Sequence, residues 1–339
     1  MIAKLQSNRV RRTYLGGSRI DAFSSGAGSS SFASSSSFSS PTPEDWMAST
    51  VTAFNGTVEI EGEGLGRLAD GRLVKDAVGS LPILVKLLDS DERLVIQAHP
   101  TVPFAKARMN SAVGKTECWY FLPGTASDAC VYLGFKPGIT REKWIQAFDE
   151  TNKRSNGRTI EQSNNSLLSW LHRIPVAPGD FVFVDGGVPH AIGGGCFMIE
   201  LQEPSDLMVV AERFTPSGRQ IPDAKLHGGL GFEGMFDVYA YEGLSYEEIC
   251  ARYVKRGSSS ASSGGNVRRI LGPELTDKFS EWLLASGATL QLPRDRGVAV
   301  VTAGAGALNG VPVEKGDRLV FAGEESLTLA GAAEVVACA

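Results

Sequence analysis

The chain lacks the features that mark secreted, membrane-spanning or nucleic-acid-binding proteins. Its five cysteines are an odd number without CxxC spacing, which favours reduced thiols in a cytosolic protein. No apolar run approaches the length needed to cross a bilayer. The net charge is only −5, so neither nucleic acid nor a membrane surface is favoured as the main partner. We therefore expect a cytoplasmic, globular protein.

Glycine and serine punctuate the chain and indicate its organisation. The 39 glycines separate short apolar runs, a pattern typical of a β-rich body with many tight turns. At 339 residues the chain exceeds one ordinary core, so two domains are expected. Residues 24–41 are almost all Ser, Gly, Ala and Phe, which predicts a disordered surface loop. A second Ser/Gly-rich stretch predicts a linker over residues 256–265, between domains at 1–255 and 266–339.

Only a few segments have helical spacing. Residues 140–152 carry apolar side chains at helical intervals, and residues 161–172 predict a second short helix, so we expect a small helical insert over 138–172. Residues 244–254 predict another helix with Ser245 as its N-cap. Beyond the linker, residues 311–317 echo residues 174–180. The C-terminal part, which has no histidine, therefore predicts a second, degenerate β-sandwich without a metal of its own.

Four polar residues form a candidate metal-ligand set. Gln97 and His99 lie on one face of a predicted strand, because side chains alternate with a period of two. Glu117 opens a second predicted strand, and His190 follows a glycine-rich turn far downstream. A mixed nitrogen and oxygen set suits a first-row divalent metal at a catalytic site, whereas a closed structural zinc site usually uses thiolates. His172, another of only four histidines, is outside this pattern and is expected to have a structural or exposed role.

Four motifs in a fixed order carry a family resemblance over roughly residues 10–245. They are Gln97-Ala98-His99-Pro100, then Gly114 to Tyr120 (GKTECWY), then Pro189 to Gly193 (PHAIG), then Glu200 to Asp206 (ELQEPSD). This ordered set resembles the type I phosphomannose isomerases (mannose-6-phosphate isomerases), which are cupin-fold zinc enzymes. The resemblance implies a mainly β fold, with a jelly-roll catalytic domain and a smaller cupin-like domain. It also implies one zinc ion per chain and metal-dependent interconversion of mannose 6-phosphate and fructose 6-phosphate. Because residues 12–17 already resemble the start of the isomerase fold, we expect no removable leader there.

The same resemblance suggests four catalytic residues. Lys115 is a candidate donor or proton carrier, and Glu200 and Asp206 are candidates for acid/base work or for orienting histidine. Two positions depart from the family: Val95 stands where serine is usual, and Val210 stands where an arginine is usual. Both positions are associated with recognition of the sugar phosphate, so Arg213 or a cation of the following loop is expected to take over.

Other functions remain open from the sequence. The same site suits an isomerase or epimerase of another or unphosphorylated sugar, and a cupin that only binds sugar belongs to a different class. A cupin Fe(II) oxygenase is disfavoured, because its facial triad uses two histidines and one carboxylate without the glutamine. The sequence leaves the oligomeric state undetermined.

Overall fold

The computed structural model describes residues 1–25, 42–54, 60–152, 159–257 and 265–339. Most of the expected Ser-rich loop and most of the expected linker lie outside these described residues. The described part is built mainly from β-strands, and its named strands all pair antiparallel. The prediction of a mainly β fold is confirmed.

Two sheets from the first 255 residues face each other. The seven-stranded sheet has the order β13 (Val254–Lys255), β9 (Phe181–Val184), β6 (Glu117–Phe121), β11 (Cys196–Gln202), β4 (Leu84–Ser90), β3 (Glu44–Met47) and β2 (Arg9–Val10). The five-stranded sheet has the order β12 (Val209–Val210), β5 (Gln97–Ala98), β10 (His190–Ile192), β7 (Cys130–Phe135) and β8 (Leu171–Pro175). Buried side chains of both sheets, such as Trp119 and Leu133, share one hydrophobic core. The two sheets therefore form a sandwich.

The C-terminal part forms a second pair of sheets. Its six-stranded sheet has the order β1 (Ile2–Lys4), β20 (Arg318–Ala322), β17 (Arg296–Ala303), β22 (Glu334–Cys338), β15 (Glu281–Leu284) and β14 (Val267–Leu271). Its four-stranded sheet has the order β16 (Thr289–Gln291), β21 (Ser326–Gly331), β18 (Ala305–Leu308) and β19 (Val311–Glu314). A separate core, which includes Phe321 and Leu329, fills the space between them.

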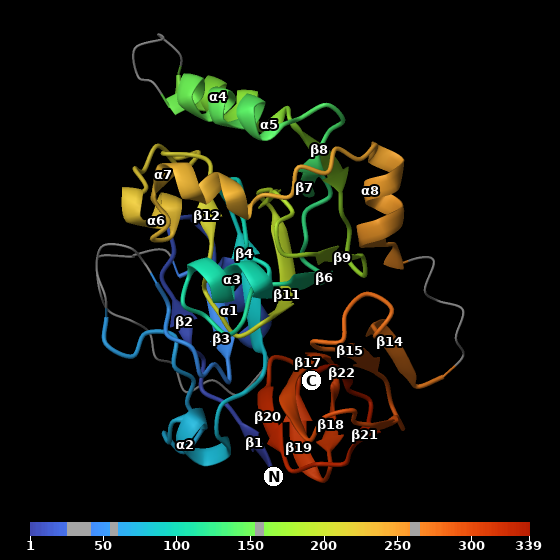
Figure 1. Ribbon diagram of the computed structural model, residues 1–339. Coiled ribbons are helices and arrows are strands. Elements are labelled where there is room, and N and C mark those ends of the chain that lie inside the picture. Colours follow the sequence, from blue (N-terminus) through green and yellow to red (C-terminus); the bar gives the residue numbers. More distant parts are fainter. Residues whose placement is uncertain (26–41, 55–59, 153–158, 258–264) are drawn as a thin grey trace.

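The two sandwiches are in contact. Alternation along β6 turns Cys118 and Tyr120 to the face opposite Trp119, where Cys118 lies 4.0 Å from Glu281 and Tyr120 accepts a 3.2 Å hydrogen bond from Arg268. The N-terminal strand β1 pairs with β20, so the start of the chain completes a C-terminal sheet (Figure 1). The division into domains at residues 255 and 266 stays a prediction, and β1 crosses it.

The described helices are short. They are α1 (Ser18–Ser24), α2 (Val74–Val78), α3 (Val102–Arg108), α4 (Arg141–Asn152), α5 (Ile160–Leu168), α6 (Asp223–His227), α7 (Gly231–Gly234), α8 (Tyr246–Tyr253) and the 3₁₀ helix η2 (Met235–Val238). The expected Ser245 cap of α8 is confirmed, and Glu248 completes a capping box. The helix expected to reach His172 ends instead at Leu168, because Leu171–Pro175 pairs with β7 as strand β8. No described helix has the length and apolarity needed to span a membrane.

Candidate metal centre

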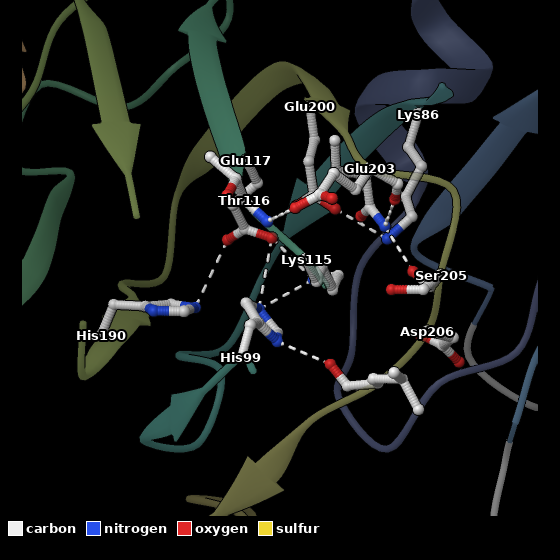
Figure 2. Close-up of polar contacts among 12 residues, drawn as sticks. Lys86, His99, Lys115, Thr116, Glu117, His190, Glu200, Glu203, Ser205 and Asp206 are labelled. Atoms are coloured by element: carbon white, nitrogen blue, oxygen red, sulfur yellow. Dashed lines mark hydrogen bonds and ion pairs between the residues drawn. The ribbon is translucent and has the colours of Figure 1, made fainter. Parts of the chain in front are cut away.

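Strands from both sheets of the first sandwich bring His99, Glu117 and His190 together. His99 directly follows β5, His190 begins β10, and Glu117 begins β6 on the facing sheet. One potential ligand atom from each residue lies within 4.8 Å of the other two, and all three side chains are buried. Figure 2 shows His99 and His190 directed at different oxygens of the Glu117 carboxylate. This is the arrangement expected of ligands that converge on a single ion.

The hydrogen bonds that the two imidazoles make to backbone carbonyls fix which ring nitrogen carries a lone pair. Nδ1 of His190 donates to the Val188 carbonyl at 2.9 Å, and Nδ1 of His99 donates to the Leu207 carbonyl at 2.9 Å. Each Nε2 therefore carries a lone pair and points into the site.

Two of the facing atoms are acceptors with no proton between them. Nε2 of His190 lies 3.4 Å from Oε1 of Glu117, and both atoms are buried without a hydrogen-bond partner. Buried polar atoms normally have partners, so a pair of opposed acceptors calls for a cation between them. The residues present therefore fit a divalent metal.

Near pH 7 all three side chains are in the protonation state that binds a metal. Burial lowers the pKa of His99, and it lowers the pKa of His190 to about 3, so both rings are neutral near pH 7. Burial alone would raise the pKa of Glu117, but Lys115, His99 and His190 together outweigh it and hold that pKa well below its usual range. Two neutral imidazoles and one carboxylate are what a divalent ion requires.

Lys115 lies inside the cluster. Its Nζ donates to Oε2 of Glu117 at 2.6 Å and to Nε2 of His99 at 2.8 Å (Figure 2). Lys115 is not a solvated lysine at a strand end, because only 3% of its side-chain surface is exposed. An ammonium at this position is placed to contact the oxygens of a molecule bound beside the metal.

Gln97, the remaining predicted ligand, borders the same space. It pairs with His190 across the β5–β10 ladder and lies two residues before His99 on the same strand face. It also lines a pocket that extends from Lys115 toward β11 and β12. Its role as a ligand stays a prediction.

That pocket is rich in cations, and four of its five are neutralised. Lys115 pairs with Glu117, and the remaining three pair at 2.7–3.1 Å: Lys86 with Glu200, Arg12 with Asp206 and Glu44, and Arg93 with Glu212. The fifth, Lys225, donates to the backbone carbonyl of Phe54 at 3.2 Å. The pocket wall also has an apolar side, which includes Val95, Met208 and Val210.

The predicted catalytic residues have different surroundings. Glu200 lines the pocket and accepts from Lys86, and burial raises its pKa. Asp206 is held by both terminal nitrogens of Arg12 at 2.9 Å, and although burial opposes it, Arg12 lowers the pKa of Asp206 far below its usual range. Arg213 pairs with Asp223 at 2.6 Å and packs over Phe232, outside the described lining of the pocket. The structure therefore brings Lys115 and Glu200 to the pocket and does not bring Arg213 there.

Sequence reasoning missed two residues of this pocket. Lys86 stands in the middle of the apolar run 81–88, and an interior lysine in a buried strand is the signal that points to it, since lysine is rarely buried unless paired. Arg12 lies about 190 residues from its partner Asp206, and no local pattern links them. His172 contacts the Leu244 carbonyl at 2.8 Å through Nε2, away from the cluster, as its expected structural role requires.

Comparison with known proteins gives matches to curated sequences and to solved structures. No family model matches the chain. The mannose-6-phosphate isomerase ManA of Bacillus subtilis is 36% identical over 125 residues, which are 37% of this chain and 35% of that protein. The mannose-6-phosphate isomerase of Streptococcus mutans is 31% identical over 125 residues, 37% of this chain and 34% of that protein. The sequence match thus spans about a third of the length of these curated relatives.

Solved structures match over nearly the whole chain. The mannose 6-phosphate isomerase from Bacillus subtilis has a TM-score of 0.71 at 20% identity, covering 100% of this chain and 99% of that one. A putative mannosephosphate isomerase from Archaeoglobus fulgidus has a TM-score of 0.64 at 16% identity, covering 99% and 96%. A mannose 6-phosphate isomerase bound with zinc and yttrium has a TM-score of 0.67 at 15% identity, covering 99% and 98%. These likenesses show that the chain has the same fold.

Proposed function

We infer that this chain is a member of the mannose-6-phosphate isomerase family and that it interconverts mannose 6-phosphate and fructose 6-phosphate with one bound divalent ion. The observation that carries the proposal is the opposed pair of acceptors, Nε2 of His190 and Oε1 of Glu117, at 3.4 Å beside a cation-lined pocket. The related structure that holds zinc supports zinc as the ion. We assign Gln97, His99, Glu117 and His190 as its ligands.

The reaction needs a charge-stabilising group and a base. When bound, the divalent ion would polarise the oxygens at the first two carbons of the open-chain sugar. Lys115 is placed to donate to the same oxygens as negative charge develops on them. The proton at carbon 2 of the aldose goes to a base, which leaves an enediolate. Return of that proton to carbon 1, with a proton shift between the two oxygens, gives the ketose.

Glu200 suits the role of this base better than Asp206. Its carboxylate lines the pocket, and burial raises its pKa toward the range in which a carboxylate is an effective base near neutral pH. Lys86 holds it at 2.7 Å and fixes its direction. Asp206 has both oxygens engaged by Arg12, so we assign it to hold Arg12 in the pocket wall.

The test is a coupled assay that follows fructose 6-phosphate formation from mannose 6-phosphate. We expect turnover that a chelator abolishes and added zinc restores. Absence of turnover by the zinc-loaded protein would contradict the proposal.

An isomerase of an unphosphorylated sugar is the second candidate. It is favoured by the apolar wall that Val95 and Val210 give the pocket, because neither side chain can bind a phosphate. The same assay with free mannose separates the two functions. Equal turnover of both sugars would favour the second.

A further inference from the structure

Lys225 differs electrostatically from every other cation of the pocket. Each of the other four has a carboxylate within about 3 Å, whereas the one hydrogen bond described for the Lys225 ammonium goes to the Phe54 carbonyl at 3.2 Å. Among the described residues, no carboxylate lies within 4.0 Å of its Nζ. Yet only 4% of Lys225 is exposed. A lysine is rarely buried this deeply without a charged partner, because desolvating an ammonium costs several kcal/mol.

More distant carboxylates compensate the charge of Lys225 only in part. Burial and then the charge of Arg12 lower the pKa of Lys225 to about 8, while Asp206, Glu44 and Glu63 act in the opposite direction. The ammonium therefore remains protonated at pH 7. An anion entering the pocket would offset the cost of burying it.

Lys225 lines the same pocket as Val95 and Val210, the two positions at which the sequence departs from the family pattern. Val95 and Val210 belong to one apolar cluster, and Leu226 of α6 packs into that cluster. The residue before Leu226 is Lys225, so packing of α6 on the two valines directs this lysine to the pocket. The cation is thus supplied beside the wall from which an arginine is missing.

The other cations of this region are already paired. Arg213 is paired with Asp223 at 2.6 Å, and Arg219 is paired with Glu92. Neither lies in the described lining of the pocket, whereas Lys225 does.

We propose that Lys225 binds the phosphate group of the substrate and thereby selects phosphorylated over free sugar. The identity of the sugar rests on the proposed function above, but the anion site does not. The site would take a phosphate dianion, which a buried ammonium binds as a point charge.

The test compares Lys225→Met with the wild-type protein, both loaded with zinc. Methionine keeps the length and the apolar stem and removes only the charge. We expect the KM for mannose 6-phosphate to rise roughly tenfold or more, since a hydrogen bond to a charged group contributes about 1.5–3 kcal/mol. The affinity of Lys225→Met for inorganic phosphate, measured by calorimetry and by competitive inhibition, should fall by a similar factor. Lys225→Arg should retain part of the affinity for mannose 6-phosphate and for inorganic phosphate.

Two controls separate binding from folding. Lys106→Met makes the same change on the exposed face of α3 and should leave the KM and phosphate binding as in the wild type. The melting temperature of Lys225→Met should equal or exceed that of the wild type, because a buried charge that is compensated only in part is removed. A lower melting temperature together with unchanged phosphate binding would assign Lys225 a structural role and overturn the proposal.

Failure of the anion site is distinguishable from failure of the isomerase. If the wild type turns over mannose 6-phosphate while Lys225→Met keeps its KM and its phosphate inhibition constant, the anion site is refuted and the proposed function stands. If the wild type turns over no sugar but binds phosphate, and the Lys225→Met variant does not bind phosphate, the anion site stands and the proposed function falls.

Discussion

The free Nε2 lone pair of His190 and the unpartnered Oε1 of Glu117 cannot satisfy each other, because neither atom carries a proton. Left alone, this pair costs stability, since buried acceptors without partners lose the free energy of hydration. The sequence pointed to both residues through local signals, namely a histidine after a glycine-rich turn and a carboxylate opening a strand.

The first prediction at this scale concerns the metal. His99→Ala and His190→Ala should each remove the ion, because loss of one imidazole leaves too few ligands to hold it. Atomic spectroscopy of the purified protein should give about one divalent ion per wild-type chain and close to none in either variant. His172→Gln, which lies outside the cluster, should keep the wild-type metal content. Full metal content in both alanine variants would refute the ligand assignment.

The second prediction concerns the base. Glu200→Gln keeps the size of the side chain and an oxygen that can accept from Lys86, but it cannot take a proton. We expect kcat to fall by a factor of about 10²–10⁴, the usual contribution of general acid–base catalysis, with the metal content unchanged. Steady-state kinetics and metal analysis on the same preparation check this. If kcat stays within a few-fold of the wild type, the base is another residue.

At the scale of the element, two residues, Glu203 and Lys278, position the start of β6. Glu203, which follows β11, accepts from the backbone nitrogen of Thr116 at 2.9 Å through Oε2, and Oε1 accepts from Gly114 at 3.3 Å. Lys278, from the turn before β15, donates to Oγ1 of Thr116 at 2.6 Å and to Oε2 of Glu203 at 2.7 Å. A residue of the histidine-free C-terminal part therefore helps to fix the segment that carries Lys115 and Glu117.

We expect Lys278→Met to weaken metal binding roughly tenfold, the lower end of the effect of removing a residue that orients a metal ligand. Competition with a chelator measures this directly, and Lys278→Arg should retain most of the affinity. Unchanged affinity in Lys278→Met would mean that Glu203 alone is enough to hold the segment. No local sequence pattern indicates this contact, because 75 residues separate Lys278 from Glu203.

Individual elements were easier to predict than the contacts between them. Ser245 caps α8 as expected, since a cap depends only on residues within one turn. The echo between residues 174–180 and 311–317 reappears as equivalent turns, in which Asp180 accepts from Ala177 and Asp317 accepts from Glu314. By contrast, β1 joins β20 across more than 300 residues of sequence, and no local pattern specifies such a pairing.

At the scale of the whole molecule, the seven-stranded sheet lies between two partners. Its inner face meets the five-stranded sheet around the metal centre, and its outer face meets the six-stranded sheet. Glu281 lies in this outer junction, fully buried, with Sγ of Cys118 and Sγ of Cys338 each 4.0 Å from its carboxyl group. Thiols are weak donors, so they stabilise an ionised carboxylate poorly.

Burial raises the pKa of Glu281 to about 8, against an opposing effect of Arg268. The folded protein therefore binds a proton here that the unfolded chain releases near pH 4.5, so the free energy of unfolding should fall as pH rises between these values and level off above pH 8. The slope from this group is at most about 1.4 kcal/mol per pH unit. In Glu281→Gln, which stays neutral, the slope should be absent.

Urea unfolding of both proteins at pH 5 to 9, with excess zinc, measures the difference in stability between them at each pH, so effects of metal binding cancel. Exposed Glu325→Gln should differ from the wild type by a constant amount. If the stability difference between Glu281→Gln and the wild type is also constant with pH, Glu281 is ionised in the folded protein. The stability of the junction then does not depend on pH through this residue.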